Sequence, residues 1–198
     1  MRHQRPGPLL AALPNMLTVL RLILVPVLIV LMVLYPTPDN AGMWWAFAVF
    51  FVAGVTDKLD GDLARAWNLV SNFGKIADPI ADKALVLPAL FLLAYNSVGH
   101  KPMAIVVITW ICVISIAIRE LGISVWRMVL VRSGRVVPAS AGGKIKTAVQ
   151  MGFIGLSLVP WNTFAPEIVA NVIGYLVWAL LPVATYLALK SGWDYVTK

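Results

Sequence analysis

The sequence predicts an all-α, polytopic membrane protein with six transmembrane helices and both termini in the cytoplasm. Its composition is the first reason, because 60% of the 198 residues are hydrophobic and only 13% are charged. Soluble domains are about half apolar and about a quarter charged. The second reason is a mean hydropathy of +0.85. The third is that the apolar residues gather into six stretches, each near the roughly 20 residues that a helix needs to cross a bilayer.

Short polar breaks containing Pro, Gly and Asn separate these stretches and predict loops between helices. The six expected spans are residues 15–35, 43–65, 74–95, 104–127, 145–161 and 168–189. They leave no room for a soluble domain of ordinary size. We therefore expect one integral membrane domain over residues 1–198.

The first stretch has a competing interpretation as a cleavable signal peptide, because Arg2 and Arg5 precede it. Arg21 interrupts the stretch, however, and apolar residues then continue to Tyr35 without a cleavage site of small residues. We expect a retained first span.

The positions of the cations predict the orientation, since Lys and Arg concentrate on the cytoplasmic side of membrane proteins. An even number of spans places both termini on one side. If that side is the cytoplasm, Lys101 alone lies outside and the other cations lie inside: Arg2, Arg5, Arg21, Lys58, Arg65, Lys75, Lys83, Arg119, Arg127, Arg132, Arg135, Lys144, Lys146, Lys190 and Lys198. The net charge of +7 therefore indicates topology, and we expect no nucleic-acid partner. The single cysteine, Cys112, lies in an apolar run, which excludes a disulfide scaffold.

The second and third stretches carry acidic residues at their inner ends, where contact with lipid is costly. Five of the nine acidic residues fall within 26 positions: Asp57, Asp60, Asp62, Asp78 and Asp82. Carboxylates at membrane depth are retained when they face a polar cavity, a partner or an ion. These five residues are therefore candidates for a functional site.

Helical spacing, at about 100° per residue, predicts which of these side chains converge. One face of the second span, about 140° wide, holds Asp57, Asp60, Gly61, Ala64 and Arg65. One face of the third span holds Gly74, Asp78 and Asp82. Asp62 points away from the first of these faces and is left out of the site.

Four carboxylates on neighbouring helices require cations close by. Basic side chains could neutralise part of the charge, but oxygen donors without Cys or His suit hard divalent ions such as Mg²⁺ or Mn²⁺. Small residues on the same faces leave room for a ligand near the backbone, and close helix packing is the alternative reason for them. Arg65 offers a planar fork that suits phosphate.

The pattern Asp57-x2-Asp60-Gly61-x2-Ala64-Arg65-x8-Gly74-x3-Asp78-x3-Asp82 resembles the complete signature of the CDP-alcohol phosphatidyltransferases. This resemblance implies a six-helix membrane enzyme of phospholipid biosynthesis, usually a homodimer. Such an enzyme transfers a phosphatidyl group from a CDP-linked lipid to an alcohol and releases CMP.

The resemblance also implies roles for the residues of the pattern. Two divalent metal ions, Mg²⁺ or Mn²⁺, are expected on Asp57, Asp60, Asp78 and Asp82. Asp82 is expected to be the catalytic base that deprotonates the acceptor. The CDP group is expected on Asp57, Gly61, Ala64, Arg65 and Gly74.

A second basic cluster follows in the fourth and fifth stretches, and an anionic acceptor is one reason for it. The candidate ligands of an acceptor phosphate are Arg119, Arg127, Lys144 and Lys146. Alternatively, Arg119 pairs with an aspartate and the loop cations set the topology or contact anionic lipid. Asn15, Thr18 and Arg21 are candidates for the cavity lining, and helix capping, a polar bundle contact or snorkelling explains them equally well.

The segments around these residues are similar to the phosphatidylglycerophosphate synthase branch of the same family. They include Arg119-Glu120-Leu121, Ser140-x2-Gly143-Lys144-x-Lys146-Thr147 and Pro14-Asn15-x-Leu17-Thr18-x2-Arg21. The similarity implies CDP-diacylglycerol as donor, glycerol 3-phosphate as acceptor, and a bacterial inner-membrane enzyme whose active site faces the cytosol. Ile118 stands where that branch usually has Gly before the Arg-Glu pair.

Two alternatives remain open. A sister phosphatidyltransferase would use inositol phosphate, serine or phosphatidylglycerol as acceptor. A divalent-cation transporter would also place carboxylates in the membrane. The transporter predicts acidic residues continuing toward the outer face, and spans four to six contain only Glu120 as an interior acid.

Overall fold

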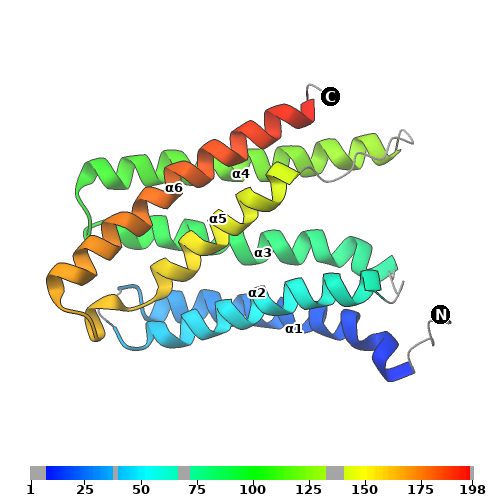
Figure 1. Cartoon of the computed structure of the whole chain (residues 1–198), viewed down its shortest axis with the longest axis horizontal. Coiled ribbons are helices and arrows are strands. Elements are labelled where there is room, and N and C mark those ends of the chain that lie inside the picture. Colours follow the sequence, from blue (N-terminus) through cyan, green and yellow to red (C-terminus); the bar gives the residue numbers. More distant parts are fainter. Residues whose placement is uncertain (1–7, 38–39, 67–71, 133–140, 197–198) are drawn as a thin grey trace.

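In the computed structural model, which describes residues 8–37, 40–66, 72–132 and 141–196, the six apolar stretches are six long helices (Figure 1). They are α1 (Pro8–Leu34), α2 (Met43–Ala66), α3 (Asn72–Ser97), α4 (Met103–Arg132), α5 (Ala141–Leu158) and α6 (Glu167–Val196). A short 3-10 helix, η1 (Trp161–Thr163), precedes α6. No strand occurs within these ranges, so the prediction of an all-α chain is confirmed.

The helices match the expected spans but extend further at one end of the bundle. α1 begins at Pro8 instead of Asn15, and α6 continues to Val196 instead of Leu189. Hydropathy marks only the part of a helix that suits lipid, whereas backbone hydrogen bonds extend the helix into polar surroundings. The first turn of α1 and the last turn of α6 lie at the same end of the bundle (Figure 1).

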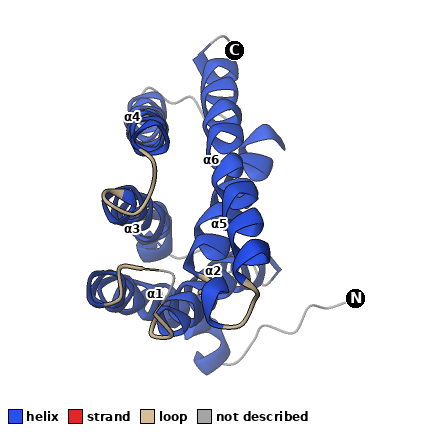
Figure 2. Ribbon diagram, turned by 90° about the vertical axis from the view of Figure 1, so that its left-hand side faces the viewer, coloured by secondary structure: helices blue, strands red, loops and turns tan. Residues whose placement is uncertain are grey.

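The helices pack in neighbouring pairs. α1 packs along α2, α5 along α6 and α4 against α6, while α3 contacts α1 more extensively than α2 among the described residues. Figure 2 shows α3 and α4 on one side of the bundle and α5 and α6 on the other. The expected meeting of α2 and α3 at their inner ends involves side chains 71–79, which lie outside the described part.

Four helices are long and apolar enough to cross a membrane, within Asn15–Leu34, Ile80–Ser97, Met103–Trp126 and Glu167–Trp193. α2 and α5 do not reach this composition in the part of the chain that was searched. α2 carries the charged residues of the acidic motif, and α5 is the shortest of the six helices, with 18 residues. The six-span topology therefore stays a prediction for these two helices.

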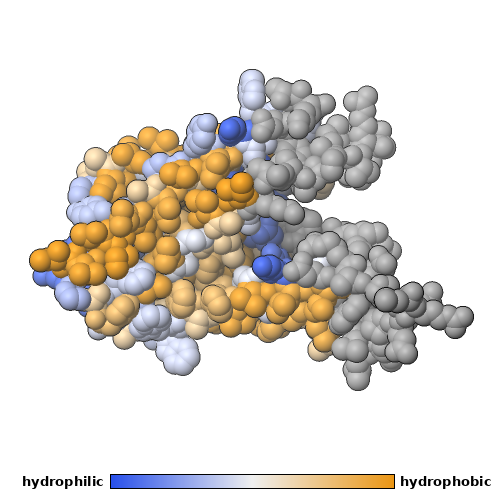
Figure 3. Space-filling model, viewed as in Figure 1, coloured by the Kyte–Doolittle hydropathy of each residue, from blue (hydrophilic) through white to orange (hydrophobic). Residues whose placement is uncertain are grey.

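The core of the bundle and its outer surface are both apolar. Fully buried side chains such as Leu28, Met32, Phe153 and Ile154 fill the interior. Many large apolar side chains point outward, and Figure 3 shows them over most of the described part of one face. A water-soluble protein rarely exposes so continuous an apolar surface. Lipid is the solvent that suits these outward faces.

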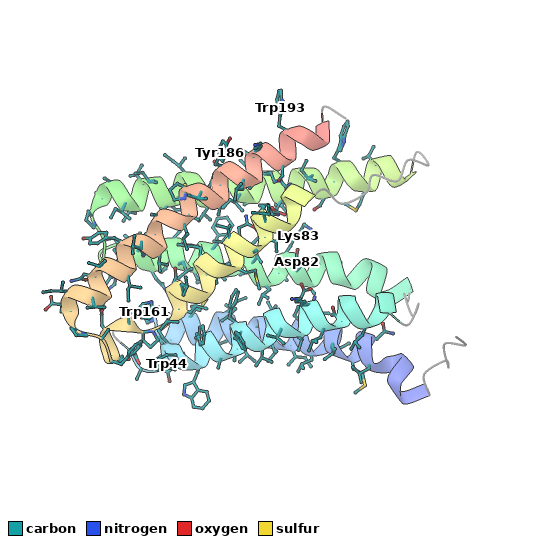
Figure 4. The ribbon with its side chains drawn as sticks, viewed as in Figure 1. Trp44, Asp82, Lys83, Trp161, Tyr186 and Trp193 are labelled. Atoms are coloured by element: carbon teal, nitrogen blue, oxygen red, sulfur yellow. The ribbon has the colours of Figure 1, made fainter. Side chains whose placement is uncertain are left out.

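Aromatic side chains lie at both ends of the bundle. Trp44 and Trp161 lie at one end, on α2 and η1, and Trp193 lies at the other end, on α6 (Figure 4). Phe164 contacts both Trp44 and Trp161, with ring centroids 5.8 and 5.6 Å away. Amphipathic rings concentrate at the headgroup level of a bilayer. We therefore expect the line that joins these two ends of the bundle to cross the membrane.

We predict that Phe153→Ala lowers the free energy of unfolding in detergent by about 3–5 kcal/mol, the usual cost of such a cavity. Phe153 is fully buried on α5 and packs edge-on against Trp178 of α6, with ring centroids 5.6 Å apart. Thermal unfolding of the purified protein measures the effect. Phe51→Ala is the control, because Phe51 is 59% exposed and should cost much less. Equal losses from both variants would contradict the assignment of the core.

Candidate active site

A buried arginine joins α1 to α2. Arg21 is fully buried, and its Nη1 lies 2.6 Å from Asp57 Oδ1. Its Nη2 donates a hydrogen bond to Asp60 Oδ2, and Thr18 Oγ1 donates to the same oxygen over 3.4 Å. Thr18 and Arg21 are three residues apart on α1, as Asp57 and Asp60 are on α2, so each pair shares a helix face. The two faces meet at this cluster.

The two carboxylates of this cluster differ in their surroundings. The Asp60 side chain is 5% exposed, whereas the Asp57 side chain is 42% exposed. One guanidinium neutralises one of the two negative charges at most. A buried charge is tolerated when it is paired and hydrogen-bonded, and Arg21 provides both for Asp60. Asp57 remains accessible to a further cation or ligand.

A second charged cluster ties α4 to α6. Arg119 Nε donates to the Ala188 carbonyl over 3.0 Å, and its Nη2 donates to Ser191 Oγ over 2.8 Å. A Cβ atom at Gly192 would lie 3.2 Å from Arg119 Cγ. The glycine therefore leaves the space through which the Arg119 side chain passes along α6.

Glu120 extends this second cluster to α5. Lys146 Nζ donates to Glu120 Oε1, and Arg119 Nη1 donates to the same oxygen over 3.0 Å. Lys146 is buried, and the Glu120 side chain is 12% exposed. One carboxylate thus holds two of the predicted phosphate ligands at a junction of three helices.

A small pocket connects this junction to α3. Its lining consists of Asp82, Lys83, Val86, Leu87, Glu120, Lys146, Thr147 and Gln150. Figure 4 shows Asp82 and Lys83 on α3 where α5 crosses it. The predicted base and one predicted acceptor ligand, Lys146, therefore face the same pocket.

The structure brings together two groups of the predicted site residues. The first group lies between α1 and α2 and consists of Thr18, Arg21, Asp57 and Asp60. The second group lies around Glu120 and consists of Asp82 and Lys146, which line the pocket, and Arg119, which pairs with Glu120. Asn15 and Gly61 are half-buried on α1 and α2. Several predicted residues have side chains outside the described part of the structure: Ala64, Arg65, Asp78, Arg127 and Lys144. The contacts of Gly74 are also outside it.

The donor atoms of the first cluster are of the type that binds a hard divalent ion. Asp57 and Asp60 are oxygen donors that already converge on a cationic group, and such donors suit Mg²⁺ or Mn²⁺. Among the side chains that the structure describes, no three of the types His, Cys, Asp and Glu are close enough to hold a metal ion. Asp78 is not among these side chains, so the four-aspartate site stays a prediction.

Sequence reasoning left two pocket residues without a role. The sequence shows Glu120 only as an interior acid and as part of the Arg119-Glu120-Leu121 segment, because its pairing with Lys146 depends on how α4 and α5 face each other. Gln150 was not singled out. The available signal was its spacing, because Gln150 follows Lys146 by four residues and therefore lies on the same helix face.

Comparison with known proteins places the sequence among its relatives. The family model described as CDP-alcohol phosphatidyltransferase matches residues 11–190. A Mycobacterium tuberculosis (strain H37Rv) protein named "Probable phosphatidylglycerophosphate synthase" is 38% identical over 189 residues, which cover 96% of this chain and 82% of that protein. A Bacillus subtilis (strain 168) protein named "CDP-diacylglycerol--glycerol-3-phosphate 3-phosphatidyltransferase" is 34% identical, over 94% of each chain. A Haemophilus influenzae protein of the same name is 34% identical, over 91% of this chain and 94% of its own.

The match extends from α1 well into α6 and includes the charged residues of both clusters. This chain therefore belongs to the CDP-alcohol phosphatidyltransferase family.

Proposed function

We propose that this protein transfers the phosphatidyl group of CDP-diacylglycerol to glycerol 3-phosphate, giving phosphatidylglycerophosphate and CMP. The relatives named for this reaction match more than nine-tenths of the chain. The structural observation that carries the proposal is that Asp82 and Lys146 line one pocket. A carboxylate suits removal of a proton from an alcohol, and a buried ammonium beside it suits an acceptor that carries a phosphate.

In the proposed reaction, an acceptor hydroxyl oxygen attacks the phosphorus that carries the diacylglycerol. A new P–O bond forms to the acceptor, and the P–O bond to CMP breaks. Asp82 accepts the hydroxyl proton, and CMP leaves with the bonding electron pair. Positioning and stabilisation of the phosphoryl charge supply most of the catalysis in such transfers.

We assign two divalent ions, Mg²⁺ or Mn²⁺, to Asp57, Asp60, Asp78 and Asp82. When bound, they would neutralise the charge that develops on the diphosphate. Arg21 supports this site from α1, because it orients Asp57 and Asp60 and compensates part of their mutual repulsion. The CDP group is assigned to Asp57, Gly61, Ala64, Arg65 and Gly74.

The acceptor phosphate is assigned to Arg119, Arg127, Lys144 and Lys146. Arg119 also has a structural role, since it ties α4 to α6. Glu120 lines the pocket and pairs with both Lys146, which also lines it, and Arg119 beside it, so the three side chains together keep a net positive charge. Cations held in place by packing lose little side-chain freedom when they bind phosphate.

The proposed setting is a bacterial inner membrane. Six helices cross the bilayer, both termini lie in the cytoplasm, and the protein forms a homodimer. The apolar outer faces of the helices accommodate the acyl chains of the donor. The charged clusters receive the polar substrate from the cytosol.

An acceptor panel tests the proposed function. Purified protein with CDP-diacylglycerol and Mg²⁺ is offered glycerol 3-phosphate, inositol phosphate, serine or phosphatidylglycerol, and CMP and the lipid product are measured. We expect product with glycerol 3-phosphate, its loss on addition of a chelator, and its recovery with excess Mg²⁺. Product from inositol phosphate with none from glycerol 3-phosphate would contradict the proposed acceptor.

We predict that Asp82→Asn lowers the rate of CMP release by at least about 100-fold, because it removes the proposed base and one ionised oxygen ligand. The matched control is Asp62→Asn on α2, whose position on the helix places it away from the site. It should lower the rate by less than about threefold. Equal losses from both variants, with normal membrane insertion, would contradict the assignment of the helix faces.

We predict that the loop between α3 and α4, which contains Lys101, lies on the extracytoplasmic side of the membrane. In a Cys112→Ser background, Lys101→Cys should react with a membrane-impermeant maleimide in intact cells. Lys190→Cys, which is exposed on α6, should react only after the cells are permeabilised. The reverse pattern of labelling would show that the orientation is wrong.

A further inference from the structure

Gln150 lines the pocket that Asp82 and Lys146 share, and its amide nitrogen is unsatisfied among the described residues. The residue is 3% exposed, and its Nε2 finds no hydrogen-bond partner among the described residues. Gln150 follows Lys146 by one helical turn, so both side chains lie on the same face of α5. Gln150 therefore carries a buried donor and lines a pocket that also contains the proposed base.

Three other polar side chains at this pocket, those of Lys146, Glu120 and Thr147, have partners. Lys146 donates to Glu120. Thr147 Oγ1 donates to the Gly143 carbonyl of its own helix over 3.1 Å. A buried amide without a partner costs free energy that an apolar side chain of the same size would avoid. Such a group is explained when a ligand supplies the missing acceptor.

The Gln150 amide N–H is a neutral hydrogen-bond donor, and this property indicates which atom of the acceptor it would bind. The acceptor phosphate is better served by the ammonium of Lys146, because charge-assisted hydrogen bonds are the stronger ones. The attacking hydroxyl oxygen needs its lone pairs for the new bond, and a strong donor on it would weaken the nucleophile. A neutral amide N–H best suits a hydroxyl oxygen that does not react.

We propose that Gln150 Nε2 donates a hydrogen bond to the non-reacting hydroxyl of a phosphorylated polyol and so selects the acceptor. This inference rests on the proposed function, and in glycerol 3-phosphate the hydroxyl concerned is the central one. Gln150 would then be a specificity-determining residue in a pocket whose charged groups select only for phosphate. A site with a buried donor discriminates strongly against an analogue that leaves the donor unpaired.

The test compares two acceptors that differ by that hydroxyl alone. The substrate 3-hydroxypropyl phosphate has the same phosphate and the same primary hydroxyl as glycerol 3-phosphate but lacks the central hydroxyl. We expect the full-length wild-type protein to prefer glycerol 3-phosphate in kcat/KM by about 10- to 100-fold, the range for one buried hydrogen bond.

Gln150→Met keeps the size of the side chain and removes the donor. This variant should reduce the preference to less than about threefold, through a loss of kcat/KM with glycerol 3-phosphate and little change with the deoxy analogue. Thr147→Val is the matched control in the same pocket. Its hydroxyl is already used within α5, so this variant should keep the wild-type ratio.

A second readout does not depend on activity. Because Gln150→Met removes an unsatisfied buried amide, the melting temperature of the protein without substrate should stay the same or rise. A clear fall would show that the amide has a structural partner and would overturn the inference.

The outcomes separate this inference from the proposed function. Wild-type activity with glycerol 3-phosphate and a ratio that Gln150→Met leaves unchanged would overturn the inference alone. Equal losses with both acceptors would do the same, because they would indicate an effect through Asp82 or packing. A wild-type protein that uses another acceptor and not glycerol 3-phosphate would overturn both.

Discussion

The pairing of Arg21 with Asp57 and Asp60 is the interaction on which the site depends. A guanidinium with no exposed surface, in a bundle whose outside is apolar, is stable only if anions meet it. The requirement acts in both directions, because Asp60 is nearly as buried as the arginine. It fixes the rotation of α1 against α2 and brings two carboxylates to one point. The same pairing leaves Asp57 exposed enough to meet a ligand.

In the second cluster, buried cations are stabilised by an anion. Glu120 accepts hydrogen bonds from Arg119 and Lys146, so three helices meet around one carboxylate. The described side chains of the first cluster carry more acidic than basic groups, and those of the second carry more basic than acidic groups. Donor diphosphate with metal ions suits the first cluster, and an anionic acceptor suits the second. Asp82 faces the pocket of the second cluster from α3.

The sequence alone was enough to predict the helices, because apolar stretches of spanning length leave few alternatives in a bilayer. The shared face of Asp57 and Asp60 also followed from the helical period, and both residues do contact one guanidinium. Contacts between helices could not be predicted this way. Cavity lining, helix capping, a polar bundle contact and snorkelling explain Arg21 equally well from the sequence, and only the packing of α1 on α2 shows that it is a buried polar contact. Gln150 looked like any polar residue of a helix, since spacing does not reveal whether an amide has a partner.

Satisfied and unsatisfied polar groups have different consequences at this site. Charged groups that already pair with a protein side chain, such as Arg21 and Lys146, contribute mainly architecture and electrostatic potential at this site. Potential attracts every anion of the right size and cannot distinguish one phosphorylated alcohol from another. Discrimination requires a directional group whose hydrogen bond is made with one ligand and missing with the next. Gln150 is the buried pocket residue that meets this condition among those described, because its amide nitrogen is buried and has no protein acceptor there. Selection of the acceptor is thereby separated from the charges that hold the bundle together.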